Sequence, residues 1–464
     1  MGSKNKSRAE ETRGSREAKL ARKTEPTGLG RRRLILAGAG GAGLLAVAAV
    51  TGYRAGWFGG ATPEVNTAQT PGTAPPPALL PPVKMAADRG NAIKATTEIV
   101  SHYTNLLRNA SSSIHALRGL GRRFSLQDGT NIVDHLTSTY SADREVNGQR
   151  YIYIPREYEV HDNSFLKTFL EAGLSPQQVL VAKGGNRYTL NDLGNSAKSL
   201  FRFDPGNLRR YDPEFPENHL PWCLIALSRL APPENSTWVN AYGEKIDLSE
   251  LVDIGLADFE GVCNKLAIPG DTPHGENVQF RGKIVSYSCF GMHSFYGFFS
   301  AYRNGYRVNN YERRIRQLFN HLIERLDRDV VALEEETVAA RIQGQQYVAR
   351  MGNSADGKRR GQGGPPAELI DVMSLKHFIV TIGHAIEAIN FVRLNNLLPI
   401  TPGQISLINR HESRLFEALT RMRSYNLDTF FKWDPKFVSD IVIGLGHALR
   451  AMKLLGPDNP DIAA

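Results

Sequence analysis

The sequence predicts an all-α fold with small β-hairpin insertions, preceded by a single apolar helix near the N-terminus. Three observations carry this prediction. Beyond residue 85, apolar residues recur at intervals of three and four, which is the period of an amphipathic helix. Runs with the alternating pattern of strands are few and short. Before residue 85, one long uncharged stretch follows a strongly basic tail.

The basic tail and the uncharged stretch predict a membrane or export segment. Residues 1–33 hold eleven Lys and Arg against four Glu, and we interpret them as a disordered cytoplasmic tail. Residues 34–53 carry no charge and are long enough to cross a bilayer as a helix. Arg31 and Arg32, followed by apolar residues, resemble a twin-arginine export signal. The segment is either a cleaved signal or a retained transmembrane anchor. Both place the remaining chain in the periplasm or cell exterior.

Composition divides the remaining chain into a linker, one large domain and a short tail. Residues 54–84 form a linker, because seven prolines between 59 and 84 favour a semi-extended tether. The folded domain spans residues 85–455, and residues 456–464 form a C-terminal tail. Within the domain, the polar, Gly-rich segment 343–368 predicts a mobile loop.

Charge and motifs exclude several classes of protein. The net charge of +9 resides mostly in the tail, which leaves about +2 on the folded part and argues against nucleic-acid binding. Three cysteines, Cys223, Cys263 and Cys289, are too few for a disulfide framework. The sequence has no phosphate-binding P-loop, dinucleotide fingerprint, G-x-S-x-G elbow or H-E-x-x-H motif.

Start and stop signals delimit the predicted helices and hairpins. Asn147-Gly148 predicts a hairpin turn, and residues 236–251 predict a second small ribbon that leads into a helix. Thr401-Pro402 and Asp434-Pro435 each combine a cap residue with a proline at the first helical position. Gly173 ends a helix that Asp162 or Asn163 begins. Helical periodicity covers the segments 91–121, 162–175, 220–233, 248–267, 311–343, 373–397, 401–424 and 434–455.

A histidine-containing phrase recurs four times in these segments, at His115, His293, His384 and His447. Each histidine is followed by a small residue at +1, an apolar residue at +2 and a small residue at +4. Small residues at these positions let a neighbouring helix approach closely. The recurrence therefore predicts a repeated helical hairpin in which each histidine-bearing helix presents the same face.

This pattern resembles the α/α-toroid superfamily, which includes six-hairpin glycosidases, N-acylglucosamine 2-epimerases and prenyltransferase-like rings. Residues 383–388, GHAIEA, resemble an inner helix of the epimerases, and residues 288–297, SCFGMHSFYG, are similar to inner helices of the prenyltransferase-like rings. The resemblance implies that residues 85–455 form a double ring of helical hairpins around a cavity. The D-x-D-D box of terpenoid cyclases is absent, which argues against cyclase activity.

The first candidate catalytic pair is His384 and Glu387. They are three residues apart, so they share one face of a helix, and a His–carboxylate pair can transfer protons near neutral pH. The resemblance to the epimerases implies proton transfer by an inner-helix histidine, which also indicates His384. The alternative is a histidine that is hydrogen-bonded at a contact between helices.

Two polar loops supply further candidates. Asp212 and Glu217 could act as acid and base in glycoside cleavage. Carboxylates on loops are more often simply solvated. Three candidate ligand-binding residues lie in or beside these loops, namely His219, Trp222 and His274. A fourth candidate is His447, in the fourth repeated phrase.

A zinc site is a third hypothesis. Cys289 and His293 are four residues apart on a predicted helix, and zinc in prenyltransferase-like toroids is bound by Cys and His. A buried cysteine beside a core histidine is the alternative. Apart from this zinc ion, no cofactor is predicted.

The sequence therefore predicts an exported, membrane-tethered α/α-toroid protein that binds a cell-envelope partner or polymer through its concave face. The alternatives are a carbohydrate-active hydrolase, lyase or epimerase, and a zinc-dependent enzyme. The predicted partners are the membrane, through the N-terminal helix, and an envelope polymer or protein, but no nucleic acid.

Overall fold

The computed structural model describes residues 88–159, 161–202, 220–266, 291–352, 366–457 and 459. The chain divides into two compact units, Met1–Val50 and Thr51–Ala464, and every described residue belongs to the second. The described residues form thirteen α-helices and three separate two-stranded antiparallel sheets. This confirms the all-α class with β-hairpin insertions. The predicted tail, N-terminal apolar segment and linker lie outside the described residues.

Helices dominate the order of elements along the chain. The three ribbons pair β1 (Ala142–Val146) with β2 (Gln149–Tyr153), β3 (Val179–Val181) with β4 (Arg187–Thr189), and β5 (Thr237–Val239) with β6 (Lys245–Asp247). The helices are α4 (Arg89–Leu107), α5 (Ala110–Leu120), α6 (Ile132–Tyr140), α7 (Ser164–Glu171), α8 (Leu190–Leu200), α9 (Leu220–Leu230), α10 (Leu248–Leu266), α12 (Met292–Arg303), α13 (Tyr311–Gly352), α14 (Leu369–Leu394), α15 (Pro402–Met422), α16 (Leu427–Trp433) and α17 (Pro435–Lys453).

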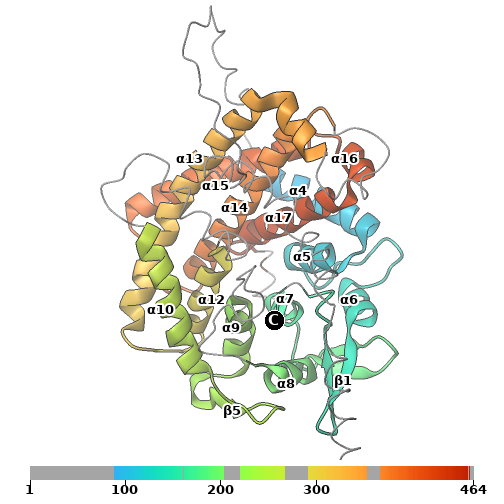
Figure 1. The fold of residues 1–464 in the computed structure, drawn as a ribbon, viewed down its shortest axis with the longest axis vertical. Coiled ribbons are helices and arrows are strands. Elements are labelled where there is room, and N and C mark those ends of the chain that lie inside the picture. Colours follow the sequence, from blue (N-terminus) through green and yellow to red (C-terminus); the bar gives the residue numbers. More distant parts are fainter. Residues whose placement is uncertain are drawn as a thin grey trace, which may run out of the picture. The chain divides into compact units, whose positions relative to one another are not determined.

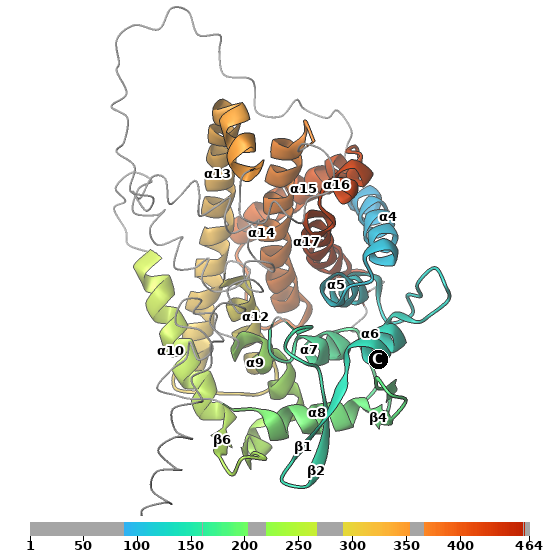
Figure 2. The same cartoon turned by 45° about the vertical axis from the view of Figure 1, so that its right-hand side comes forward.

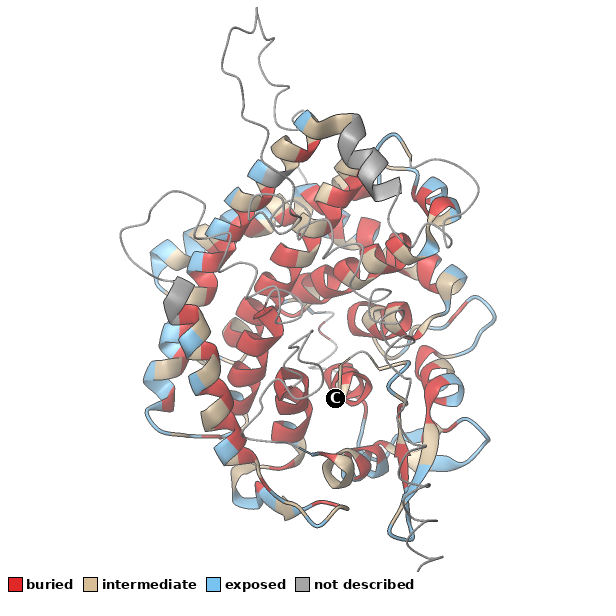
Figure 3. Cartoon of the chain, in the orientation of Figure 1, coloured by how far each residue is buried: buried red, intermediate tan, exposed pale blue. Residues whose placement is uncertain are grey.

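Six helices contact one another in a series that returns to its start (Figure 1). Helix α5 packs on α17, α17 on α14, α14 on α12, α12 on α9, α9 on α7, and α7 again on α5. We call these six helices the six-helix series. Its members are mostly buried, whereas α10 and α13 carry exposed residues along one side (Figure 3).

A second set of helices packs against this series. Helix α4 contacts α5 and α17, α15 contacts α4 and α14, and α13 contacts α12 and α14. Helix α10 contacts α9 and α12, α8 contacts α7 and α9, and α6 contacts α5. Figure 2 shows α14 between α13 and α17. Each helix of the six-helix series is therefore in contact with at least one helix of the second set.

Local sequence signals explain where several of these elements begin and turn. Thr401 forms a capping box with Gln404 at the start of α15, and the Asp434 side chain accepts hydrogen bonds from the first turn of α17. Asn147 and Gly148 both have positive φ in the β1–β2 turn, as a two-residue hairpin loop of this type requires. These predictions are confirmed, as is the ribbon formed by β5 and β6.

Several features of the fold differ from the sequence predictions. Helices α6, α8 and α16 are not among the predicted segments, and the predicted segment 91–121 divides into α4 and α5. The β3–β4 ribbon is not predicted, although Gly184 and Gly185, both with positive φ, supply the turn between its strands. Helix α13 continues past Gln343, where the sequence predicts the start of a mobile loop, and it kinks at Gly344, which has φ 44° and ψ −119°. Glycine tolerates this backbone conformation because it lacks a Cβ.

The close helix approach predicted from the small residues is confirmed. A Cβ added to Gly446 of α17 would lie 2.5 Å from the carbonyl oxygen of His115 in α5. A Cβ added to Gly383 of α14 would lie 3.2 Å from Ala448 of α17. The small residues beside the repeated histidines therefore bring the backbones of α5, α14 and α17 together.

Helix α14 is the one described helix long and apolar enough to span a membrane. Its 26 residues contain an 18-residue window with mean hydropathy 1.4, and 67% of that window is buried. The helix also packs against α12, α13, α15 and α17 and carries the buried residues His384 and Glu387. These contacts describe a helix of the protein core.

A buried cluster of histidines and charged residues

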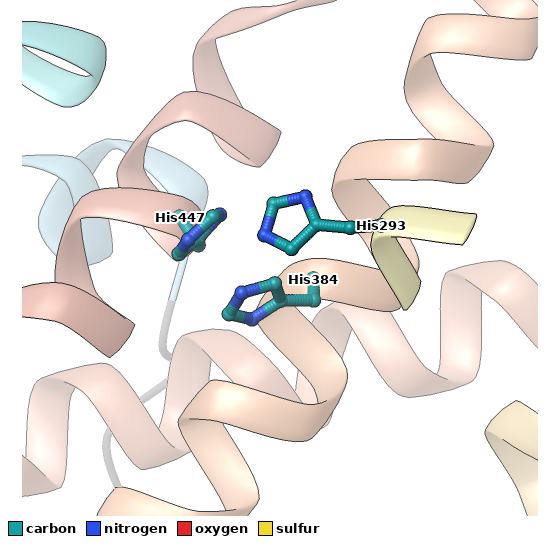
Figure 4. Close-up of side chains that lie close together, drawn as sticks. All are labelled: His293, His384 and His447. Carbon is teal, nitrogen blue, oxygen red and sulfur yellow. The ribbon is translucent and has the colours of Figure 1, made fainter. Parts of the chain in front are cut away.

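The four repeated histidines converge from four helices of the six-helix series. His384 and His447 stack with ring centroids 3.5 Å apart, and His293 lies 5.2 Å and 5.3 Å from these two rings. His115 lies 4.9 Å from His447. Figure 4 shows three of the rings facing one another from α12, α14 and α17. These three are buried and His115 is half-buried.

Charged side chains lie next to the histidines. One helical turn after its histidine, each helix carries a polar residue, and α7 adds a lysine and a glutamate. These side chains are Arg118, Tyr296, Glu387, Arg450, Lys167 and Glu171, and together with the four histidines we call them the polar cluster.

Two carboxylates join the members of the polar cluster. Glu387 accepts hydrogen bonds from Arg118 and pairs with Arg450 Nε at 2.9 Å. Glu171 Oε2 lies 2.9 Å from Arg118 Nε and 2.9 Å from Lys167 Nζ. Arg118 therefore links α5 to α7 and α14 through ion pairs.

Among the described residues, the polar cluster holds three cationic side chains and two carboxylates. Arg118, Lys167 and Arg450 face the two carboxylates Glu171 and Glu387, and all five residues are between 0% and 4% exposed. Burial raises the pKa of Glu387, although Arg118 and Arg450 oppose this effect. Burial would also raise the pKa of Glu171, but Arg118, Lys167 and Arg450 hold it well below its usual value.

The histidines and Lys167 of the polar cluster have lowered pKa values. Burial holds the pKa of His293, His384 and His447 well below its ordinary value, and nearby cations including Arg118 lower it further. These histidines are therefore uncharged at neutral pH. Burial, reinforced by Arg118 and opposed by Glu171, lowers the pKa of Lys167 to about 8.

The hydrogen bonds of His384 differ from those of the predicted pair. His384 Nδ1 lies 2.6 Å from the Val380 carbonyl oxygen, which accepts its hydrogen, and Glu387 instead lies 2.7 Å from Nδ1 of His447. The His–carboxylate pair in this structure is therefore His447–Glu387, and Arg118 Nη1 lies 2.7 Å from the same His447 nitrogen. His384 Nε2 is buried and has no hydrogen-bond partner among the described residues.

The other predicted site residues lie partly outside the described residues. Trp222 of α9 is buried, stacks on His161 at 3.9 Å and lies 4.5 Å from the His293 ring. It thus lies beside the polar cluster. His293 belongs to the cluster, but the Cys289 proposed as its zinc-binding partner is not described. Asp212, Glu217, His219 and His274 also lie outside the described residues.

Sequence reasoning missed Arg118, Arg450, Lys167 and Glu171. A signal for the first two exists, because each repeated histidine is followed at +3 by a polar residue on the same helical face. Lys167 and Glu171 interrupt the otherwise apolar run of α7 at the i, i+4 spacing of an ion pair. Ionisable residues on an apolar helix are a signal of a buried polar site.

A hollow among the described residues lies away from the polar cluster. It has a volume of about 370 Å³ and is lined by residues of α10 and α13 and the segment before α13, including Asp253, Glu260 and Arg314. Arg314 is ion-paired with both carboxylates, which accounts for the polar lining. None of the predicted site residues lines this hollow.

The polar cluster therefore brings together His293, His384, Glu387 and His447 of the predicted site residues. Comparison with known proteins adds no assignment, because no protein-family model, no curated protein and no solved structure matches this chain.

Proposed function

We propose that this chain is an α/α-toroid enzyme whose reaction centre is the polar cluster. The contact series of α5, α17, α14, α12, α9 and α7, with a second helix packed outside its members, supports the toroid. In such a ring the side chains that converge from several helices line the centre, where toroid enzymes bind their substrates. Buried ionisable groups with shifted pKa values concentrate at functional sites, because catalysis requires them and stability alone does not favour them.

The convergence of cationic side chains favours an anionic substrate. Arg118, Lys167 and Arg450 come together in the polar cluster from α5, α7 and α17. Arginine and lysine side chains are the groups that bind carboxylates and phosphates in proteins. Because the resemblance to toroid epimerases and glycosidases suggests a carbohydrate, we propose a carboxylated sugar unit of a cell-envelope polymer as the first substrate class to test.

The proposed reaction is the removal of a proton from the carbon next to the substrate carboxylate. Arg118 and Arg450 would bind the carboxylate and stabilise the negative charge that develops when the proton leaves. Lys167 is the proposed base, because a lysine with a pKa of about 8 exists partly as the free amine near neutral pH. Returning the proton to the opposite face gives an epimer, and loss of the oxygen on the next carbon gives an elimination product.

A direct test compares two buried lysines. Lys167→Met removes the proposed base, and Lys376→Met is the matched control, since Lys376 of α14 is also buried and pairs with Asp440 outside the polar cluster. The variants are incubated with uronate-containing and neutral envelope oligosaccharides, and the products are identified by mass spectrometry. Circular dichroism verifies that both variants fold.

We expect turnover of the anionic oligosaccharides by the wild type and by Lys376→Met. We expect the turnover rate of these oligosaccharides to be about 10²–10⁴-fold lower in Lys167→Met than in the wild type. Equal turnover by the two variants would contradict the role of Lys167. Binding of an oligosaccharide by the wild type without any conversion would contradict the enzyme and favour the alternative of a polymer-binding protein.

We also propose that the folded domain lies outside the cytoplasmic membrane. The support is the basic tail 1–33 followed by the uncharged segment 34–53. An alkaline phosphatase fused to the C-terminus is active only when it is exported. An inactive fusion with normal expression would contradict this location.

A further inference from the structure

The three histidines His293, His384 and His447 are arranged as a set of ligands. One ring nitrogen from each histidine can be chosen so that the three atoms lie within 4.8 Å of one another, and each ring comes from a different helix (Figure 4). Ligand nitrogens of a tetrahedral zinc site lie about 3.4 Å apart, given Zn–N distances of about 2.0–2.1 Å. Because the His384 and His447 rings stack with their centroids 3.5 Å apart, metal binding requires these rings to tilt until their lone pairs converge.

Two of the rings have the partners that metal-binding histidines have. His384 Nδ1 donates to the Val380 carbonyl oxygen at 2.6 Å. His447 Nδ1 lies 2.7 Å from Glu387 Oε2, and it donates to this carboxylate in the tautomer that carries its proton on Nδ1. Such bonds to a backbone carbonyl or a carboxylate fix the tautomer and leave the lone pair of Nε2 for the metal.

An unsatisfied nitrogen points to a missing ligand. His384 is 3% exposed, and its Nε2 has no hydrogen-bond partner among the described residues. A buried nitrogen that accepts no bond costs free energy, whereas coordination to a cation would satisfy it. The three imidazoles are also uncharged at neutral pH, as coordination requires.

Arg118 competes for one of these nitrogens. Its Nη1 lies 2.7 Å from Nδ1 and 3.2 Å from Nε2 of His447. Metal binding therefore requires Nη1 to leave His447 Nε2, while the other guanidinium nitrogens keep their bonds to Glu171 and Glu387.

We propose that His293, His384 and His447 bind one Zn²⁺ ion through three imidazole nitrogens, with an anionic oxygen ligand in the fourth position. Three neutral imidazoles suit zinc and leave the open position typical of a catalytic site. The cationic side chains of Arg118 and Lys167 near the histidines favour an anion, hydroxide or a substrate carboxylate, as the fourth ligand. The metal's role in chemistry rests on the proposed enzyme function, but metal binding itself does not.

The test uses the full-length chain, purified in detergent and without a polyhistidine tag, because a tag would itself bind metal. The protein is stripped with a chelator and reloaded with Zn²⁺ or Co²⁺. Metal per chain is then measured by mass spectrometry, and the visible spectrum of Co²⁺ reports tetrahedral coordination. His384→Gln and His293→Gln remove ligands. His411→Gln is the control, since His411 is 1% exposed in α15 and pairs with Asp327 away from the cluster.

We expect about one ion per chain in the wild type and in His411→Gln, together with a tetrahedral Co²⁺ spectrum. We expect folded His384→Gln and His293→Gln to lose stoichiometric binding. Zn²⁺ should also raise the melting temperature of the wild type and of His411→Gln, but not that of His384→Gln or His293→Gln. If a ligand variant fails to fold, the metal content and the Co²⁺ spectrum of the wild type still test whether the protein binds the ion.

A folded wild type that takes up no stoichiometric Zn²⁺, or a ligand variant that binds as well as His411→Gln, would overturn the site. The outcome is independent of substrate. A protein that binds zinc but converts no oligosaccharide refutes only the enzyme proposal, and a chelated protein with full turnover refutes a catalytic zinc.

Discussion

The contact between α5 and α17 makes a specific prediction about Gly446. In Gly446→Ala, the new Cβ would lie 2.5 Å from the carbonyl oxygen of His115 and 2.9 Å from its carbonyl carbon. Nonbonded carbon contacts are favourable at about 3.5–4.0 Å, so the two helices must separate by about 1 Å. The obstacle is backbone, and no side-chain rotation relieves it.

Two opposing effects set the size of the change. Overpacking a core costs about 1–3 kcal/mol, and replacing glycine by alanine in a helix gains about 0.5–1 kcal/mol. The two ranges together give a net loss of about 0–2.5 kcal/mol in the free energy of unfolding for Gly446→Ala, with a middle value of about 1 kcal/mol. Gly261→Ala in α10 is the control, because a Cβ there meets nothing within 4 Å. It should gain about 0.5–1 kcal/mol.

Urea unfolding followed by circular dichroism measures both variants, with stability read from the midpoint at unchanged slope. Gly446→Ala should be less stable than the wild type, and Gly261→Ala should be more stable. If Gly446→Ala is as stable as Gly261→Ala, then the close approach of α5 and α17 is not a real constraint on this position, and the reasoning is refuted.

Three further predictions concern charges and caps. Glu387→Gln should cost about 3–5 kcal/mol in urea unfolding, because it leaves Arg118 and Arg450 buried without this carboxylate; a loss below about 1 kcal/mol would contradict the network. Thr401→Ala should cost about 1 kcal/mol, because the Gln404 backbone N–H loses its acceptor, and an unchanged midpoint would argue against the cap. Burial raises the pKa of Glu159 from 4.5 to about 8, so the folded state keeps a proton that the unfolded state has released. The contribution of Glu159 to stability should therefore fall as the pH rises between these values, by up to about 1.4 kcal/mol per pH unit. It is measured as the difference in unfolding free energy between the wild type and Glu159→Gln, which should change from about pH 5 to pH 8 in this direction, whereas an unchanged difference would contradict the buried proton.

Local signals in the sequence predict local structure well in this chain. The caps at Thr401 and Asp434 and the turn at Asn147-Gly148 are confirmed because each depends on residues close together in the chain. The β3–β4 ribbon is missed although its strands are as long as those of the β5–β6 ribbon, which is predicted.

The candidate site is only partly predictable, because it depends on contacts between residues that are far apart in the chain. The repeated histidines identify the faces that come together, but their partners come from distant segments. Arg118 reaches Glu171 in α7 and Glu387 in α14, and periodicity within one helix carries no information about such pairs. The same holds for His384, whose Nδ1 is bound by the Val380 carbonyl instead of the Glu387 predicted from spacing.

The packing of α5 against α17 has a consequence for how the domain forms. These helices lie near opposite ends of the domain, so Arg118 meets His447 only after more than 300 intervening residues have been synthesised. Contacts at such separation form late and slow the assembly of a chain. A polypeptide that stops before Pro435 would leave α5 and α14 with exposed apolar faces and Glu387 without Arg450. Removing this last long helix should therefore yield aggregation-prone material and no smaller stable domain.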